Sequence, residues 1–125
     1  MTAFESGYVP GRHKVDDYGG GGFRFADMSH RGSILALPSG VRAVPLTSAA
    51  EIDAAMIDRA LSESGGLDFF VVGTGRDLAP LAGALRAKLR AAGVGCEAMA
   101  TGAAVRTYNL LVDEDRRVGA LLIAV

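Results

Sequence analysis

Three short apolar runs in the C-terminal two thirds of the chain predict strands of a buried sheet. Residues 67–72 and 118–125 are almost continuously apolar, which is typical of strands that are covered on both faces. Residues 94–99 form a third run, which contains one charged residue and predicts another strand. Glycine or charged residues mark at least one end of each run.

The N-terminal third is rich in β-strand signals. Residues 23–26 alternate between apolar and polar side chains, as expected of a strand with one exposed face. Residues 33–38 and 41–44 predict two further strands, and Ser39-Gly40 between them is a turn signal. We therefore expect these two strands to form a hairpin, and the four glycines at 19–22 to form a linker or tight turn.

Three segments with apolar residues at helical spacing each begin at a residue that can cap a helix. Ser48 and Glu51 have the spacing of a capping box, and Asp53 interrupts the apolar stripe that follows them. Asp77 is expected to cap the second helix and Thr101 the third. The expected helices span residues 48–63, 77–92 and 102–113.

The order of these elements predicts an α/β fold. Strands that alternate with helices imply a central, largely parallel sheet with right-handed crossovers and flanking helices. The N-terminal β-hairpin is expected to extend or cover that sheet. The length of 125 residues suits a single domain, 1–125. Residues 1–13 lack periodicity and are interpreted as a loosely held arm or an extended edge segment.

Composition excludes several classes of protein. The chain has 13 basic and 14 acidic residues and a formal net charge of −1, so it offers no general attraction for nucleic acid. Its one cysteine, Cys96, cannot form an intrachain disulfide, which favours a reducing compartment. The N-terminal residues do not resemble a signal peptide, and we expect no transmembrane segment and a cytoplasmic protein.

Four segments in order along the chain carry a family resemblance. They are the Tyr18-Gly-Gly-Gly-Gly-Phe23-Arg-Phe25 run, Gly32-Ser-Ile-Leu35, Gly73-Thr-Gly75 and the Thr101-Gly-Ala-Ala-Val-Arg-Thr-Tyr-Asn109 run. Together they resemble the Mth938-like family, also called DUF498, over nearly the whole chain. The resemblance implies a three-layer α/β fold.

The resemblance implies little about activity. The family has no established biochemical activity, and a eukaryotic branch includes an assembly factor of mitochondrial respiratory complex I. Relatives often have cysteine where this chain has Val105, which weakens the case for a redox-active thiol at that position.

Two loops of small residues form a candidate ligand site. In an open parallel sheet, ligands favour the crevice beyond the carboxyl ends of the strands, where residues 73–75 and 100–102 are expected to lie. Helix N-termini there present free amides, and two arginines could bind an anion. The candidate anion pocket consists of Gly73, Thr74, Gly75, Arg76, Thr101, Gly102 and Arg106. Tyr108 and Asn109 are expected to support the 73–75 turn.

Plainer interpretations of the same residues stay open. One is that the glycines only permit left-handed turns, and that Arg106 pairs with Asp113 or reaches solvent. The glycine spacing after residue 73 fits neither a dinucleotide fingerprint nor a phosphate loop, and we expect no bound cofactor. His13 and His30 have no metal-ligand spacing, and Cys96 is interpreted as a small buried apolar residue.

Two functions from different classes follow. The first is a non-enzymatic interaction or assembly module with a protein partner, related to respiratory complexes. The second is a protein or enzyme that binds a small anionic ligand, with Arg76 and Arg106 as the charged groups and the amides of Thr74 and Thr101 as donors. A homo-oligomer is compatible with an exposed strand edge.

Overall fold

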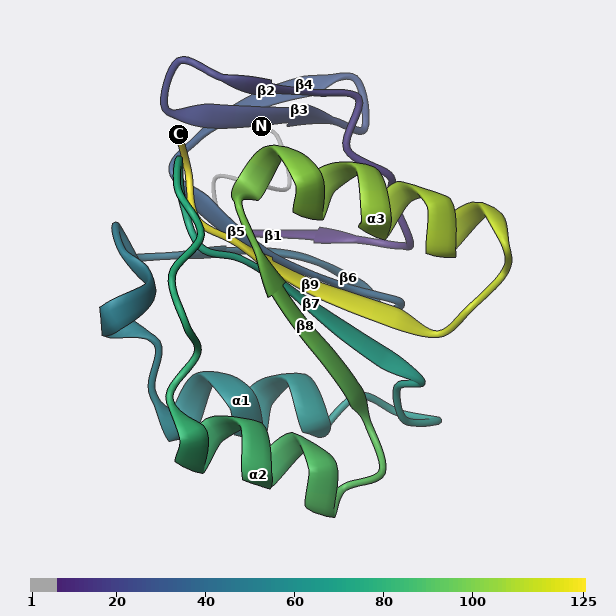
Figure 1. Cartoon of the computed structure of the whole chain (residues 1–125). Coiled ribbons are helices and arrows are strands. Elements are labelled where there is room, and N and C mark those ends of the chain that lie inside the picture. Colours follow the sequence, from purple (N-terminus) through teal and green to yellow (C-terminus); the bar gives the residue numbers. More distant parts are fainter. Residues whose placement is uncertain (1–6) are drawn as a thin grey trace.

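The computed structural model describes residues 7–125, in which a six-stranded sheet forms the centre of the molecule (Figure 1). Helices cover both faces of this sheet, and a small second sheet lies on the same side as α3. The expected α/β class and three-layer arrangement are confirmed. The strands of the central sheet, in spatial order, are β1 (Tyr8–Pro10), β6 (Gly40–Val44), β5 (Ser33–Leu37), β9 (Val118–Leu122), β7 (Phe69–Gly73) and β8 (Gly95–Met99).

The strand directions confirm a mainly parallel sheet that is extended by the predicted hairpin. Strand β7 pairs in parallel with both β8 and β9. Strand β5 runs antiparallel to β9 on one side and to β6 on the other, so four strands (β6, β9, β7 and β8) share one direction. The hairpin of β5 and β6 therefore continues the sheet, with Leu37 opposite Gly40 next to its turn.

Part of the expected N-terminal arm is an edge strand. Residues 8–10 form β1, which pairs antiparallel with β6. The Tyr8 hydroxyl donates to the carbonyl oxygen of Ser39, and the Arg42 guanidinium lies 4.7 Å from the centre of the Tyr8 ring. Residues 1–6 of the arm lie outside the described residues.

A three-stranded antiparallel sheet follows, of which the sequence predicted only the middle strand. It consists of β2 (Asp17–Gly19), β3 (Gly22–Phe25) and β4 (Met28–Arg31). Phe23 and Phe25 of β3 are buried, whereas all three residues of β2 are exposed. Without apolar alternation, β2 and β4 give no strand signal in the sequence, and they form because β3 supplies backbone partners.

The helices begin at other residues than the sequence suggested. Glu51 does accept hydrogen bonds from the backbone of Thr47 and Ser48, but this capping box opens only a single 3-10 turn, η2. Asp53 caps the α-helix proper, with its carboxylate accepting from Met56 N at 3.0 Å. Its interruption of the apolar stripe is thereby explained. The helical segments are η2 (Ala49–Glu51), α1 (Ala54–Leu61), α2 (Gly83–Ala91) and α3 (Thr101–Asp113).

The second helix starts later than expected, and Asp77 does not cap it. Ala82 is the residue before its first turn. Pro80 disfavours helical backbone at Ala79, which instead donates its amide to the Thr74 hydroxyl at 2.9 Å. Leu78 consequently lies outside the helix and is 68% exposed, although the expected helix of residues 77–92 included it.

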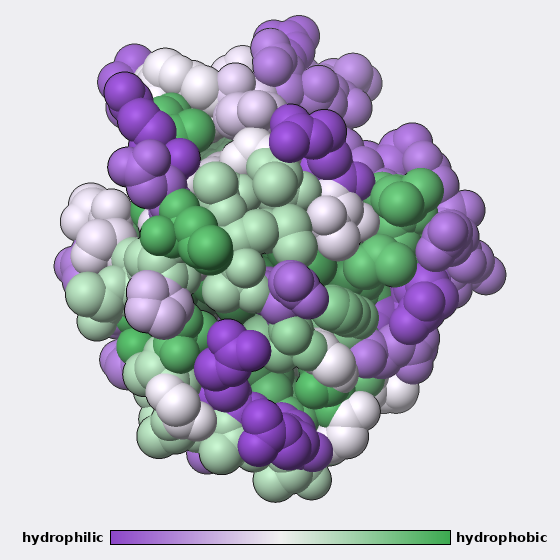
Figure 2. Space-filling view, in the orientation of Figure 1, coloured by the Kyte–Doolittle hydropathy of each residue, from purple (hydrophilic) through white to green (hydrophobic). Residues whose placement is uncertain are grey.

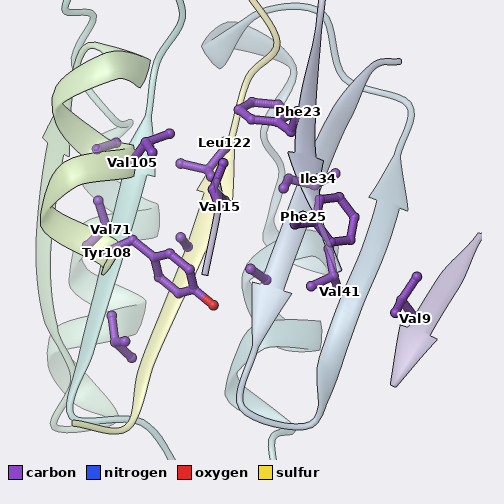
Figure 3. Packing of buried hydrophobic residues seen from close by; sticks show 14 residues of the cluster. Val9, Val15, Phe23, Phe25, Ile34, Val41, Val71, Val105, Tyr108 and Leu122 are labelled. Atoms are coloured by element: carbon purple, nitrogen blue, oxygen red, sulfur yellow. The ribbon is translucent and has the colours of Figure 1, made fainter. Parts of the chain in front are cut away.

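The central sheet separates two apolar clusters. Val71 faces α3 and the small sheet, whereas its neighbours Phe70 and Val72 face α1 and α2. Both faces of β7 are buried in this way, as its continuous apolar sequence predicted. Figure 3 shows the cluster on the α3 side, which includes Phe23, Phe25, Tyr108 and Leu122.

Helix α3 also holds the segment that leads from β1 to β2. The Tyr108 hydroxyl donates to the carbonyl oxygen of His13 at 2.7 Å. The Asn109 amide accepts from Val15 N at 2.9 Å and donates to Val15 O at 2.8 Å, as a neighbouring strand would. Lys14 forms an ion pair with Asp113 at 2.8 Å. Tyr108 and Asn109 thus support residues 13–15, and the expectation that they support the 73–75 turn is wrong.

Tyr108 should make the fold sensitive to high pH. Burial raises the pKa of its phenol to about 12 from an ordinary value of 10.0, so the folded state favours the neutral form. This contribution to stability is complete below pH 10 and is lost as the pH rises toward 12. We expect urea unfolding to show that wild type loses about 2 kcal/mol more over this range than Tyr108→Phe. Equal losses in the two proteins would contradict the assignment.

Candidate functional site

The carboxyl ends of three neighbouring strands are joined by backbone hydrogen bonds. After β7, Thr74 N donates to Met99 O at 2.9 Å, which ties the end of β7 to the end of β8. Ile123 N donates to Gly73 O at 2.9 Å, which ties β9 to the same point. The two loops expected to converge, residues 73–75 and 100–102, therefore do lie together.

A buried threonine completes this junction. The Thr101 hydroxyl donates to Ile123 O at 2.7 Å and accepts from Gly75 N at 3.0 Å. Thr101 N donates to Gly75 O at 2.8 Å. Thr101 is the first residue of α3 and does not cap it, because its side chain bonds the neighbouring strand ends. A Cβ at Gly73 would lie 3.0 Å from this hydroxyl, which is tighter than an ordinary contact, so glycine favours the close approach there.

Thr74 is held in a second set of bonds. Its hydroxyl lies 2.8 Å from Asp77 O and 3.3 Å from Met99 O, and it accepts from Ala79 N. The amides of Thr74 and Thr101, which were expected from the sequence to be donors for a ligand, already donate to main-chain oxygens. These two threonines shape the loops, and their amides are not available to a ligand.

A cavity of about 450 Å³ lies against this junction. Of the predicted site residues, the structure brings Gly75, Arg76, Gly102 and Arg106 together in its lining. Gly73, Thr74 and Thr101 lie outside the lining and support it from the strand ends. The remaining lining residues are Tyr18, Gly19, Gly20, Ala100, Ala103 and Val125.

The charges at this cavity suit an anion. Arg76 and Arg106 are both exposed. Asp113, the partner considered for Arg106 from the sequence, pairs with Lys14 instead. The first turn of α3 contributes the amides of Gly102 and Ala103, at the positive end of a helix of 13 residues. None of the described residues in the lining has an acidic side chain, and the main-chain carboxyl group of Val125, which also lines the cavity, accepts a hydrogen bond from Gly21 N at 2.7 Å.

Tyr18 is a wall of the cavity that the sequence did not reveal. Its ring packs on Gly102, where an added Cβ would collide with the tyrosine hydroxyl. The residue is 37% exposed, so part of the ring faces the cavity. The Tyr18-Gly19-Gly20 sequence is part of the family resemblance. No local pattern predicts that the β2–β3 turn brings Tyr18 to α3.

The other reactive residues lie elsewhere. Cys96 is on β8, and burial raises the pKa of its thiol while Arg86 opposes the change. Burial lowers the pKa of His30. In the part of the chain that the structure describes, no three His, Cys, Asp or Glu side chains are grouped so that they could hold a metal ion. None of the described helices combines the length and apolarity that crossing a membrane requires.

The chain therefore forms a small three-layer α/β domain that has a cavity at the carboxyl ends of its strands. Residues 15–123 match the family described as a protein of unknown function, DUF498/DUF598, and the chain belongs to this family. An uncharacterized protein of Rhodobacter capsulatus is 40% identical over 123 residues, which are 98% of this chain and 93% of that protein.

Solved structures agree with this assignment. The crystal structure of a protein described as an outer membrane protein from Bartonella henselae has a TM-score of 0.86 and 48% identity, and the match covers 92% of this chain and 97% of that one. The solution structure of a Bordetella pertussis protein described as a Mth938-like domain has a TM-score of 0.79 and 31% identity, with 89% and 85% covered. The predicted Mth938-like resemblance is thereby confirmed.

Thr101 offers a test of the junction. Thr101→Val keeps the shape of the side chain but leaves Gly75 N and Ile123 O without their hydroxyl partner. We expect a loss of about 1–3 kcal/mol in the free energy of unfolding. The valine variant should also speed the hydrogen exchange of the Gly75 amide. Thr101→Ser keeps the hydroxyl, so exchange at Gly75 should stay slow in that variant. Unchanged exchange at Gly75 in the valine variant would show that the hydroxyl does not hold the loop.

Proposed function

We propose that this chain is a non-enzymatic binding module that recognises an anionic group, such as a phosphate or a carboxylate, between the loop at Gly75-Arg76 and the first turn of α3. The observation that supports the proposal is the cavity of about 450 Å³ that Arg76 and Arg106 line together. Guanidinium groups bind phosphate and carboxylate through paired, charge-assisted hydrogen bonds.

The threonines support binding in preference to catalysis. The hydroxyls of Thr74 and Thr101, which would be the nucleophiles of this site, are engaged with main-chain groups of the loops. A hydroxyl that donates to a backbone carbonyl is not activated by a base. Burial also keeps the Cys96 thiol protonated by raising its pKa. These groups therefore hold the site in shape.

Either a free metabolite or a partner protein could supply the anionic group, since both present the same chemistry. An assembly role for the module, as in the respiratory branch of the family, would use the second source. The cytoplasmic location expected from the sequence also stays a prediction.

The proposal predicts that inorganic phosphate binds at this cavity. We expect amide shifts of Gly102 and Ala103 in an NMR titration, and a dissociation constant about tenfold or more weaker in Arg106→Gln and Arg76→Gln, because each loses a charge-assisted hydrogen bond. Arg90→Gln, which removes a charge that is also exposed from α2, is the matched control and should bind like wild type. To distinguish a phosphate carried by a partner protein from a free one, a peptide phosphorylated at its C-terminal residue is titrated in parallel with inorganic phosphate.

Two results would count against the anion site. One is the absence of phosphate binding to wild type. The other is equal weakening in all three variants, since it would reflect net charge alone.

A second candidate function is self-association through the β8 edge. Strand β8 is the last strand of the central sheet, and its outer edge is open to another strand. Leu78, beside Glu97 and Ala98, is 68% exposed. Leu110 is 58% exposed. It lies one turn of α3 after Thr107, whose hydroxyl donates to the sulfur of Met99 at the end of β8. Figure 2 shows apolar residues over much of the face that this edge occupies.

This candidate predicts a reversible dimer. Sedimentation velocity should show a concentration-dependent dimer for wild type and a monomer for Leu110→Glu, which places a charge beside the edge. Ala50→Glu, which adds the same charge at an exposed residue of η2, should dimerise like wild type. A wild-type monomer at every concentration would end this candidate.

A further inference from the structure

A larger cavity, of about 690 Å³, lies on the small sheet. Four of its polar side chains, those of Asp17, Arg24, Ser29 and Arg31, share one face of the three strands. Arg24 of β3 lies opposite Ser29 of β4, and its Nη1 is 3.3 Å from the serine hydroxyl. On the other side of β3, Asp17 of β2 lies opposite Arg24. Arg31 is two residues after Ser29 and is therefore the diagonal neighbour of Arg24 on the same face.

This outer cavity adjoins the arginine-lined cavity at α3. Tyr18, Gly19 and Gly20 line both of them. The β2–β3 turn therefore forms the ridge between the two, at the point where Figure 1 shows this turn close to the C-terminus and to the start of α3.

The ridge is low because glycines build it. Gly19, Gly20 and Gly21 have φ values of +130°, +60° and +85°, which favour glycine. A Cβ at any of the three would meet nothing within 4 Å, so the space above the turn is open. Adjacent strands lie about 5 Å apart, and the tip of a hairpin is therefore narrow enough for a small molecule to cross.

The charge is similar on the two sides of the ridge. Arg76 and Arg106 line the inner cavity, and Arg24 and Arg31 line the outer one. Among the described side chains that line either cavity, Asp17 alone is acidic, and its carboxylate accepts a hydrogen bond from Tyr18 N at 2.9 Å. The carboxyl group of Val125 at the inner cavity accepts from Gly21 N. Two pairs of guanidinium groups therefore lie on opposite sides of one narrow turn.

We infer that the two cavities form one bipartite site for a small molecule that carries two anionic groups, one at each pair of arginines, with its middle part crossing the turn at Gly19-Gly20. This inference rests on the proposed anion site at α3 and specifies its ligand. A second anionic group that is tethered to the first binds at a high effective concentration, so the pair binds more tightly than either group alone.

The experiment compares inorganic phosphate with bisphosphates whose two phosphates are joined by propane, hexane or nonane chains. Calorimetry should show that at least one bisphosphate binds about tenfold or more tightly than phosphate, with an optimum in chain length. The optimum reflects the span across the ridge, because a chain that is too short cannot reach both pairs of arginines.

Variants separate this inference from the proposed function. Arg31→Gln and Arg24→Gln should reduce the affinity for the best bisphosphate to near that for phosphate and leave the phosphate-induced amide shifts of Gly102 and Ala103 unchanged, whereas Arg106→Gln should weaken the binding of both ligands at α3. Gly20→Asn, which suits a positive φ and adds a side chain on the ridge that both cavities share, should weaken binding of the best bisphosphate by a larger factor than binding of phosphate. Arg90→Gln remains the control.

Three outcomes are decisive. If phosphate binds at α3 but no bisphosphate binds more tightly, the bipartite site is wrong and the anion site stands. The same conclusion follows if the gain in affinity survives both Arg24→Gln and Arg31→Gln. If neither phosphate nor any bisphosphate binds, both proposals fail.

Discussion

The buried hydroxyl of Thr101 is the interaction on which the rest of the site depends. It bonds Ile123 beyond β9 and Gly75 beyond β7, and it stands at the start of the helix that follows β8. Three strand ends are fixed relative to each other by one side chain in an apolar setting, where an unmade hydrogen bond would be costly. Glycine at residue 73 favours this close approach, because a Cβ there would lie only 3.0 Å from the hydroxyl.

Helix α3 transmits this constraint to the remainder of the fold. Its first turn forms one wall of the arginine-lined cavity, and its later turns hold residues 13–15 through Tyr108 and Asn109. Since these residues lead directly into β2, the same helix determines where the small sheet begins. Tyr18 is then brought onto Gly102, at the N-terminus of that helix. The cavity is thus closed by a segment of chain that is held at the opposite end of α3.

The sequence predicted the candidate site in part, because arginines and small residues after apolar strands are a local signal. Gly75, Arg76, Gly102 and Arg106 do line one cavity. The roles of Thr74 and Thr101 were misjudged. Their amides were expected to be donors for a ligand and Thr101 was expected to cap α3, whereas the neighbouring strand ends engage both residues. Tyr18 was missed as a wall because it is distant in the sequence from both of the loops it meets.

The sequence by itself determined the central α/β architecture, the strands buried on both faces and the β5–β6 hairpin. Those features arise from apolar periodicity and from turn residues, which act on neighbours along the chain. Only the tertiary structure decided that β2 and β4 are strands, that α2 begins after Pro80, and which side chains meet at the cavity. Such features depend on backbone and side-chain partners that are distant in sequence, and hydrogen bonds to those partners outweigh the weak local preferences of the residues involved.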